Sequence, residues 1–239
     1  MIFSNLPLWY TYLPMKWIEK FQLFLFDFDG LLVNTEHLHY QAYVNMLRGQ
    51  GCNLDWSFTS FCEAAHLNAT ALREMIYERF PRLNPNWDLL YAEKKRCYYD
   101  LIASGKVELM PGAAELLSAL EKSGIRRCVA TNSLREQIEL IRGQLKPLQT
   151  IPHWITREDY GKPKPDPECY LRAIELYGKP GDKIIGFEDS IRGLRALQGT
   201  PALPILVCPS HHPLLELNSE NAFHFESLQA IRFESMEKI

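Results

Sequence analysis

Acidic, hydroxyl and basic side chains follow four apolar segments of this sequence. They stand in Asp27-Phe28-Asp29-Gly30, Thr131-Asn132-Ser133, Lys162-Pro163 and Glu188-Asp189-Ser190. We expect the apolar segments to be strands of a parallel sheet, and ligands of such sheets bind at the carboxyl ends of the strands. All four fragments are therefore expected at one edge of the sheet, where they can act on one substrate.

The pair Asp27 and Asp29 is the most informative of these fragments. Side chains two residues apart point to the same side of an extended segment, whereas Phe28 between them points into the core. A carboxylate can attack phosphorus and form an aspartyl-phosphate when a cation relieves the repulsion between the two anions. The second carboxylate, Asp29, is placed to give a proton to the leaving oxygen. The pair predicts phosphoryl transfer.

The other fragments supply the remaining parts of such a site. Asp189, with Glu188 beside it, offers oxygen ligands for Mg²⁺, a hard cation. Lys162 would balance the remaining negative charge, with Lys164 as a nearby competitor for this role. The Thr131 hydroxyl and backbone N–H groups at a helix amino terminus would hold phosphate oxygens. Taken singly, these fragments also read as helix caps or exposed loops, and it is their occurrence together that favours catalysis.

The elements that must position these residues alternate in the second half of the chain. A buried strand is predicted over 21–28 and helical stretches over 36–104. Helices are then predicted at 113–123, 134–142, 167–177 and 191–198, and strands at 125–130, 153–155, 183–187 and 204–207. This order predicts an α/β fold, a doubly wound, Rossmann-like and mostly parallel sheet with helices on both faces and an inserted all-helical domain.

The predicted domain organisation follows from the same pattern. Residues 21–35 and 106–239 form the α/β catalytic core, and residues 36–105 form the helical insertion. Residues 1–20 form an amino-terminal leader of uncertain order, aromatic and broken by prolines. Met15 offers a second possible translation start within it.

Extended to their neighbours, the four fragments resemble the motifs of the haloacid dehalogenase superfamily. The matching stretches are DFDGLLVNTE at 27–36, ATNS at 130–133, GKPKPD at 161–166 and GFEDS at 186–190. The helical insertion resembles the cap domain of the β-phosphoglucomutase-like subgroup. The resemblance implies that Asp27 is the nucleophile and a metal ligand, and that Asp29 is the general acid/base and a metal ligand through its carbonyl. Thr131, Asn132 and Lys162 would contact phosphate, and Lys162 would also balance charge. Asp189 would be a metal ligand, and Glu188 either a metal ligand or a carboxylate that supports the ligands.

In the cap, the resemblance implies substrate contacts at His39, Lys94 and Lys95. On residue type alone, polar residues of a helix usually lie on a solvated face. The cap loop of the subgroup is replaced here by residues 65–70. Because the cap loop meets the leaving group, this departure leaves the substrate's identity open.

Composition excludes several classes of protein. Apolar residues make up 46% and charged residues 23% of the chain, as in soluble globular proteins. The formal net charge of -3 carries no basic stripe, so we expect no nucleic acid partner. No apolar run reaches the length of a spanning helix, so we expect no membrane partner and a cytoplasmic location. The six scattered cysteines are expected to be reduced.

These observations together predict a Mg²⁺-dependent phosphatase that hydrolyses a small phosphate monoester, such as a sugar or polyol phosphate. The partner expected is this small phosphorylated metabolite, and the sequence leaves the oligomeric state open. A β-phosphoglucomutase-like phosphomutase would use the same core residues, so only the cap could distinguish the two. A third alternative is a catalytically silent protein that binds a metabolite in the phosphate pocket.

Overall fold

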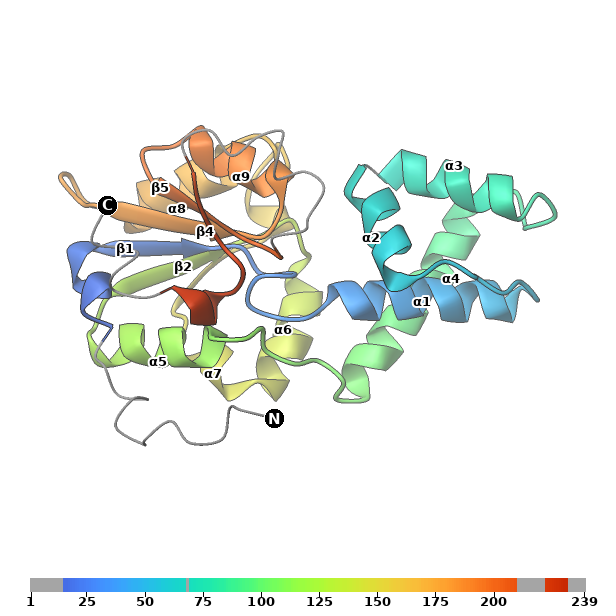
Figure 1. Cartoon of the computed structure of the whole chain (residues 1–239), viewed down its shortest axis with the longest axis horizontal. Helices are drawn as coiled ribbons and strands as arrows, with labels where there is room; N and C mark the ends of the chain where they lie inside the picture. Colours follow the sequence, from blue (N-terminus) through green and yellow to red (C-terminus); the bar gives the residue numbers. More distant parts are fainter. Residues whose placement is uncertain (1–14, 68, 210–221, 232–239) are drawn as a thin grey trace, which may run out of the picture.

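The core of the protein is a parallel sheet in a computed structural model that describes residues 15–67, 69–209 and 222–231. Within the described residues the sheet has the strand order β3-β2-β1-β4-β5-β6, and all neighbours are parallel (Figure 1). The strands are β1 (Leu23–Phe26), β2 (Arg126–Ala130), β3 (His153–Ile155), β4 (Ile184–Glu188), β5 (Leu203–Val207) and β6 (Phe223–Phe225). The order reverses between β1 and β4, and open sheets of this kind bind ligands at such a point.

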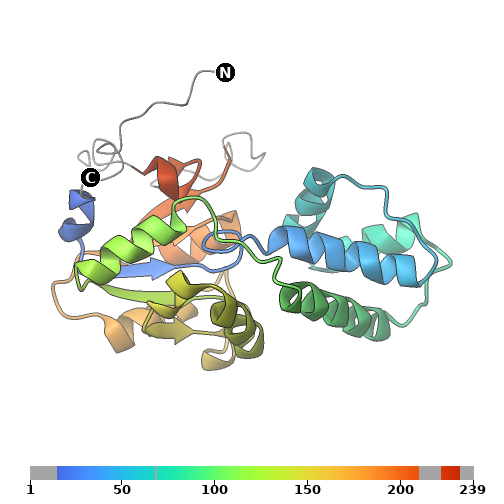
Figure 2. The same cartoon turned by 90° about the horizontal axis from the view of Figure 1, so that it is seen from below.

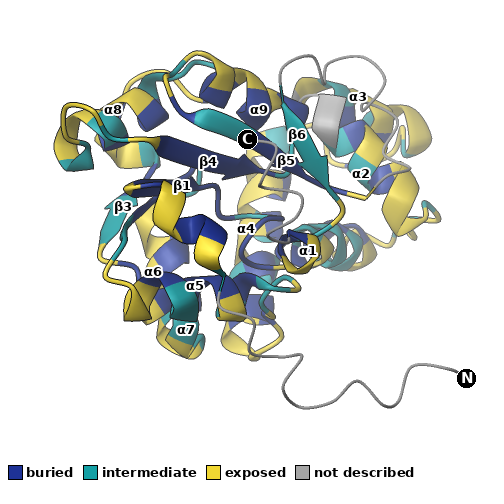
Figure 3. Cartoon of the chain, turned by 60° about the vertical axis from the view of Figure 1, so that its left-hand side comes forward, coloured by how far each residue is buried: buried dark blue, intermediate teal, exposed yellow. Residues whose placement is uncertain are grey.

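Helices cover both faces of the sheet because its central strands are apolar on both sides. In β1, Phe24 and Phe26 join one buried cluster, whereas Leu23 and Leu25 join another on the opposite face. The central strands β1 and β4 are accordingly buried throughout (Figure 3). One face packs on α5 (Ala113–Lys122), α6 (Arg135–Gln144) and α7 (Lys146–Gln149), and the other on α8 (Glu168–Tyr177) and α9 (Ile191–Gln198).

A separate group of helices stands beyond the carboxyl ends of the strands (Figures 1 and 2). Its members are α1 (Glu36–Gly49), α2 (Phe58–Leu67), α3 (Ala69–Arg79) and α4 (Trp87–Ala103). These helices have a buried cluster of their own, which includes Tyr43, Met46 and Leu90. The two connecting segments pair with each other, since the N–H of Asn34 donates to Glu108 and that of Met110 to Leu32. The helical group is thus an insertion between β1 and α5.

The predicted leader extends too far along the chain. Residues 1–14 lie outside the described residues, but Lys16–Lys20 forms a 3₁₀ helix whose Trp17 is buried. The Trp17 ring lies 5.8 Å from that of Phe24 and 6.4 Å from that of Phe187. The short helix therefore belongs to the core rather than to a leader.

The predicted fold class is confirmed, and the predicted strands and helices lie close to the observed ones. Two short elements lack a strong sequence pattern: α7, of four residues, and β6, of three. Both are too short to show the hydrophobic period of a helix or a strand. β6 pairs with β5 at the sheet edge through backbone hydrogen bonds, which do not depend on a side-chain pattern. Among the described helices, none is both long and apolar enough to cross a membrane.

Replacing Phe187 by alanine tests the packing under the carboxyl end of β4. The Phe187 ring is fully buried and stacks on Phe26 at 5.2 Å between ring centroids. Loss of the ring should lower the free energy of unfolding by about 3–5 kcal/mol, measured by urea denaturation. Leu176→Ala, on the half-exposed side of α8, is the control and should change it by less than about 0.5 kcal/mol. Equal effects of the two substitutions would contradict this packing.

Candidate active site

The site lies where the strand order reverses, at the carboxyl ends of β1 and β4. Phe26 pairs with Phe187 in register, and the N–H of Asp27 donates to the Phe187 carbonyl at 3.0 Å. This pairing brings Asp27, which follows β1, beside Glu188 and Asp189 at the end of β4. The predicted meeting of these fragments at one sheet edge thus follows from the strand register.

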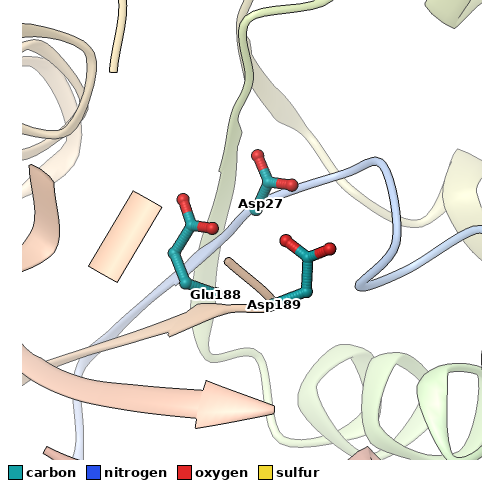
Figure 4. A group of neighbouring side chains, drawn as sticks. All are labelled: Asp27, Glu188 and Asp189. Carbon is teal, nitrogen blue, oxygen red and sulfur yellow. The ribbon is translucent and has the colours of Figure 1, made fainter. Parts of the chain in front are cut away.

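Three carboxylates meet at this point. Asp27, Glu188 and Asp189 each offer an oxygen atom, and these atoms all lie within 4.8 Å of one another (Figure 4). Glu188 is fully buried and Asp27 nearly so, while Asp189 is partly exposed. Such a set of oxygen donors suits a hard divalent cation.

The loop after β1 closes tightly over Asp189. Gly30 has φ +79°, and a Cβ added there would lie 2.1 Å from Asp189 Oδ2. A larger residue would therefore both strain the backbone and displace the carboxylate. Glycine at this position lets the backbone of the first fragment approach the carboxylate of the last.

Lys164, and not Lys162, is the lysine of this site. Its ammonium lies 2.5 Å from Asp27 Oδ1 and 2.6 Å from Glu188 Oε1, and it also donates to the Ala130 carbonyl. The Tyr170 hydroxyl accepts a hydrogen bond from Lys164 at 2.8 Å and donates one to Glu188 at 2.5 Å. Lys164 thus links the ends of three neighbouring strands.

The prediction for Lys162 is wrong in its placement. The Lys162 side chain is 77% exposed, and its ammonium lies 3.8 Å from Asp166. The local cause is Glu168, whose carboxylate accepts from the N–H groups of Gly161 and Lys162 and turns this part of the loop outward. Two residues on, the Lys164 N–H donates to Asn132 Oδ1 at 3.2 Å, which directs its side chain inward.

Without a cation, the negative charge of the carboxylates in the site exceeds the positive charge of Lys164. Burial opposes the charge of Lys164, but Asp27 and Glu188 more than offset it and hold the pKa of the ammonium above its usual value. Burial, with repulsion from Asp27, raises the pKa of Glu188 to about 7. Burial and repulsion from Asp27, Glu36 and Glu188 raise the pKa of Asp189 well above its usual range. One lysine therefore does not neutralise the cluster, and a divalent cation fits this excess of negative charge.

Asp29 is held by hydroxyl groups from two directions. Thr35 Oγ1 donates to its Oδ1 at 2.6 Å, and Ser133 Oγ donates to its Oδ2. Gln137 Nε2 lies 3.3 Å from Oδ1. Burial and the charge of Asp27 raise the pKa of Asp29, which favours the protonated form that a general acid needs.

Thr131 and Asn132 are structural parts of the same edge. Thr131 is buried, and its hydroxyl accepts from the Ser133 N–H at 3.0 Å. Asn132 Oδ1 accepts from the Tyr160 hydroxyl at 2.7 Å as well as from Lys164. The predicted phosphate contact of these two residues stays a prediction, and the contacts observed show that they shape the loops that present Lys164 and Ser133.

In the helical group, His39 and Lys94 meet and Lys95 does not join them. Lys94 Nζ lies 2.7 Å from His39 Nδ1 and above the ring of Tyr98, whereas Lys95 is exposed. Burial, followed by repulsion from Lys95, lowers the pKa of Lys94 to about 8. Burial and the Lys94 charge keep the pKa of His39 well below its usual value, so the imidazole is neutral and accepts from the ammonium.

A cavity of about 280 Å³ opens beside Asp189. Its wall includes Asn34 and Met110 from the connecting segments, Phe58 from α2 and Ser227 near the carboxyl end of the described chain. Its size suits a small ligand rather than a polymer.

Substitution of each lysine by methionine separates their roles. Lys164→Met leaves two buried carboxylates without their partner and should lower the free energy of unfolding by about 3–5 kcal/mol. Lys162→Met changes an exposed side chain and should alter it by less than about 0.5 kcal/mol. Urea denaturation of both variants checks the difference, and a larger loss for Lys162→Met would contradict the assignment.

Comparison with known proteins agrees with this geometry. Residues 21–199 match the family of haloacid dehalogenase-like hydrolases. Protein CbbY of Rhodobacter capsulatus is 32% identical over 197 residues, which cover 79% of this chain and 85% of that protein.

Solved structures share the fold. The crystal structure of CbbY from Rhodobacter sphaeroides with phosphate has a TM-score of 0.72 and 22% identity, covering 91% of this chain and 99% of that one. β-Phosphoglucomutase from Clostridium difficile has a TM-score of 0.67 and 20% identity, covering 91% and 96%. From the family match over 21–199 and the 32% identity to CbbY, we conclude that this chain is an enzyme of the haloacid dehalogenase-like hydrolase family.

Proposed function

We propose that this protein is a Mg²⁺-dependent phosphatase that hydrolyses a small phosphate monoester through an aspartyl-phosphate on Asp27. The observation that carries this proposal is the position of Asp27, which contacts Lys164 and lies with Glu188 and Asp189 around one point. A nucleophile that must attack an anion needs positive charge at this point. The lysine supplies part of it and the oxygen donors provide a place for the rest.

Asp27, Asp189 and the Asp29 carbonyl would hold Mg²⁺, with Glu188 as a further ligand or as a partner of Lys164. When bound, Mg²⁺ offsets charge between the carboxylates and the phosphoryl oxygens. The fit of these residues to a hard cation rests on their all-oxygen donors and on their excess of negative charge.

The proposed reaction uses Asp27 and Asp29 in two steps. Asp27 attacks phosphorus while protonated Asp29 gives its proton to the leaving alcohol oxygen, which departs with the electrons of the P–O bond. Asp29, now a carboxylate, then takes a proton from the water that attacks the aspartyl-phosphate and restores Asp27. Lys164 orients Asp27 through both steps. Thr131 and backbone N–H groups near it are proposed to hold phosphoryl oxygens.

The helical group is proposed to be a cap that meets the rest of the substrate. Within it, Lys94 is 4% exposed and has neutral His39 as its hydrogen-bond partner, so its charge is available to an anionic or hydroxyl-rich leaving group. Lys95 is less suited, because it is exposed and lies over the Tyr91 ring. Closure of such a cap would exclude bulk water during the first step.

Relatives support a phosphorylated carbohydrate or polyol as the substrate class. A CbbY structure contains xylulose-(1,5)bisphosphate, and matching proteins are described as a phosphorylated carbohydrates phosphatase of Thermotoga maritima and a (DL)-glycerol-3-phosphatase of Arabidopsis thaliana. The cavity of about 280 Å³ is consistent with a molecule of this size. Phosphomutase activity is the second candidate, supported by the shared fold of β-phosphoglucomutase.

Asp27→Asn tests the nucleophile directly. The amide has the shape of the carboxylate but is a poor nucleophile, so phosphate release should fall by on the order of 10³-fold or more. The assay is release of phosphate from sugar phosphates, polyol phosphates, nucleotides and phosphoglycolate. Asp100→Asn, on the exposed side of α4, is the matched control and should retain full activity.

Retained activity in Asp27→Asn would refute the proposed mechanism. If the unsubstituted enzyme releases no phosphate from any compound, isomer interconversion of sugar phosphates is assayed next. Interconversion would establish the mutase, and its absence would favour the silent binding protein.

Binding of Mg²⁺ should stabilise the fold, and more so as the pH rises. At 100 times its Kd the ion would add about 2.7 kcal/mol to the free energy of unfolding. Protons compete for Asp189 and Glu188, whose pKa values are raised, the latter to about 7. At fixed Mg²⁺ the increase in Tm should therefore be larger near pH 8 than near pH 6.

Asp189→Asn should abolish this increase, whereas Asp55→Asn, at an exposed ion pair with Arg79, should keep it. An equal increase in both variants would show that Mg²⁺ binds elsewhere. This assay needs no substrate.

A further inference from the structure

Gln137 occupies the contact between the sheet edge and the helical group. It lies in the first turn of α6 and is 9% exposed. Its Nε2 faces three oxygen atoms, at 2.9 Å from the Tyr98 hydroxyl, 3.2 Å from Ser133 Oγ and 3.3 Å from Asp29 Oδ1. Tyr98 belongs to α4 of the helical group, whereas the other two belong to the core.

These three acceptors compete for one amide group. An amide nitrogen carries two hydrogen atoms, so Gln137 can serve two of the acceptors well at a time. Ser133 Oγ itself donates to Asp29 Oδ2, so the amide reaches Asp29 both directly and through Ser133. The orientation of the Asp29 carboxylate is thereby tied to the amide of Gln137.

The position of the Tyr98 hydroxyl depends on how α4 packs against the core. The Tyr98 side chain is buried, and its ring stacks on His39 at 4.1 Å between centroids. A second glutamine of α6, Gln144, donates to the Ile102 carbonyl of α4 at 3.0 Å. Both glutamines therefore hold α4 on α6, but of these two only Gln137 also contacts Asp29.

We propose that Gln137 is a positioning residue, which orients Asp29 for proton transfer only while Tyr98 of the helical group is seated on α6. When Tyr98 moves away from α6, the Gln137 amide hydrogen atom that it accepted becomes available to Asp29 or Ser133. The hydrogen bonds around the Asp29 carboxylate then change. The position of the helical group is thus communicated to the acid/base. This inference rests on the role proposed above for Asp29.

The two steps of the reaction give this role a recognisable signature. In the first step, a poorly placed Asp29 slows cleavage of an ester whose leaving oxygen is strongly basic and needs a proton. A weakly basic leaving group departs without a proton, so its ester is cleaved at nearly the normal rate. In the second step, Asp29 takes a proton from water whatever the ester was. Phenyl phosphate and p-nitrophenyl phosphate are similar in size and differ in the basicity of the leaving oxygen, so this pair separates the two steps.

The test compares Gln137→Leu with Gln144→Leu in stopped-flow and steady-state assays. For Gln137→Leu, kcat with phenyl phosphate should fall on the order of 10- to 100-fold with little change in KM. With p-nitrophenyl phosphate, a burst of about one nitrophenolate per active site should precede slow turnover, because the second step is impaired more than the first. Gln144→Leu loses a similar bond to α4 and should show neither effect. Gln137→Asn should restore part of the rate if its amide reaches Asp29.

Absence of the burst with p-nitrophenyl phosphate, or the same losses in Gln144→Leu, would overturn the proposal and leave Gln137 with a structural role. A substrate-free measurement accompanies the kinetics. The side-chain amide signals of Gln137, assigned by their absence in Gln137→Leu, should shift in both Asp29→Asn and Tyr98→Phe. Signals that respond to neither substitution would also refute it.

The outcomes that refute the role of Gln137 differ from those that refute the proposed phosphatase activity. If neither ester is hydrolysed by the unsubstituted enzyme, the phosphatase assignment is affected, and the amide signals still decide whether Gln137 links Tyr98 to Asp29. If both esters are hydrolysed and Asp27→Asn is inactive, the phosphatase stands whatever Gln137 does.

Discussion

The rest of the site depends on the contacts of a single ammonium group, that of Lys164. It is 4% exposed and contacts Asp27, Glu188, the Ala130 carbonyl and Tyr170. Removing a charge from water costs several kcal/mol, and these contacts offset that cost only while all of them are kept. Because the partners come from the ends of β1, β2 and β4 and from α8, the same bonds that hold Asp27 also fix the relative position of four elements.

The sheet topology makes this cluster possible. Reversal of the strand order between β1 and β4 leaves their carboxyl ends side by side, with helices of opposite faces diverging from them. Short loops then bring the polar fragments over the strand ends, and Gly30 allows the closest approach. The helical group is inserted at this edge, so that α1 and α4 bring His39, Lys94 and Tyr98 toward Asp29. The carboxylate cluster and these polar residues of the helical group thus lie at the same edge of the sheet.

Much of this arrangement could be predicted from the sequence, because strands, helices and the acidic fragments have strong local patterns. The sequence pattern identifies Asp27, Glu188 and Asp189 because they stand at the carboxyl ends of apolar strands. The resemblance of GKPKPD to the family motif favours Lys162 over Lys164, but residue type and spacing do not show which of two lysines separated by one proline points inward. That choice depends on Glu168 and Asn132, which bind the loop from other elements.

Tyr170 and Gln137 were missed for a related reason. Each lies in a helix whose pattern predicts only a buried face, and neither belongs to a recognisable fragment. Their roles arise from contacts with residues distant in the chain, Glu188 for Tyr170 and both Tyr98 and Asp29 for Gln137. A buried polar residue in the first turn of a helix that follows a site fragment is the signal that could have drawn attention to Gln137.

The central claim, that Asp27 becomes phosphorylated, is tested most directly by trapping the intermediate. The enzyme is quenched during turnover of its best monoester and reduced with borohydride, which converts an acyl phosphate of aspartate to homoserine. Peptides are then sequenced by mass spectrometry. The account predicts homoserine at position 27, dependent on the presence of substrate. Unmodified Asp27 beside homoserine at another aspartate, or no homoserine during confirmed turnover, would contradict it.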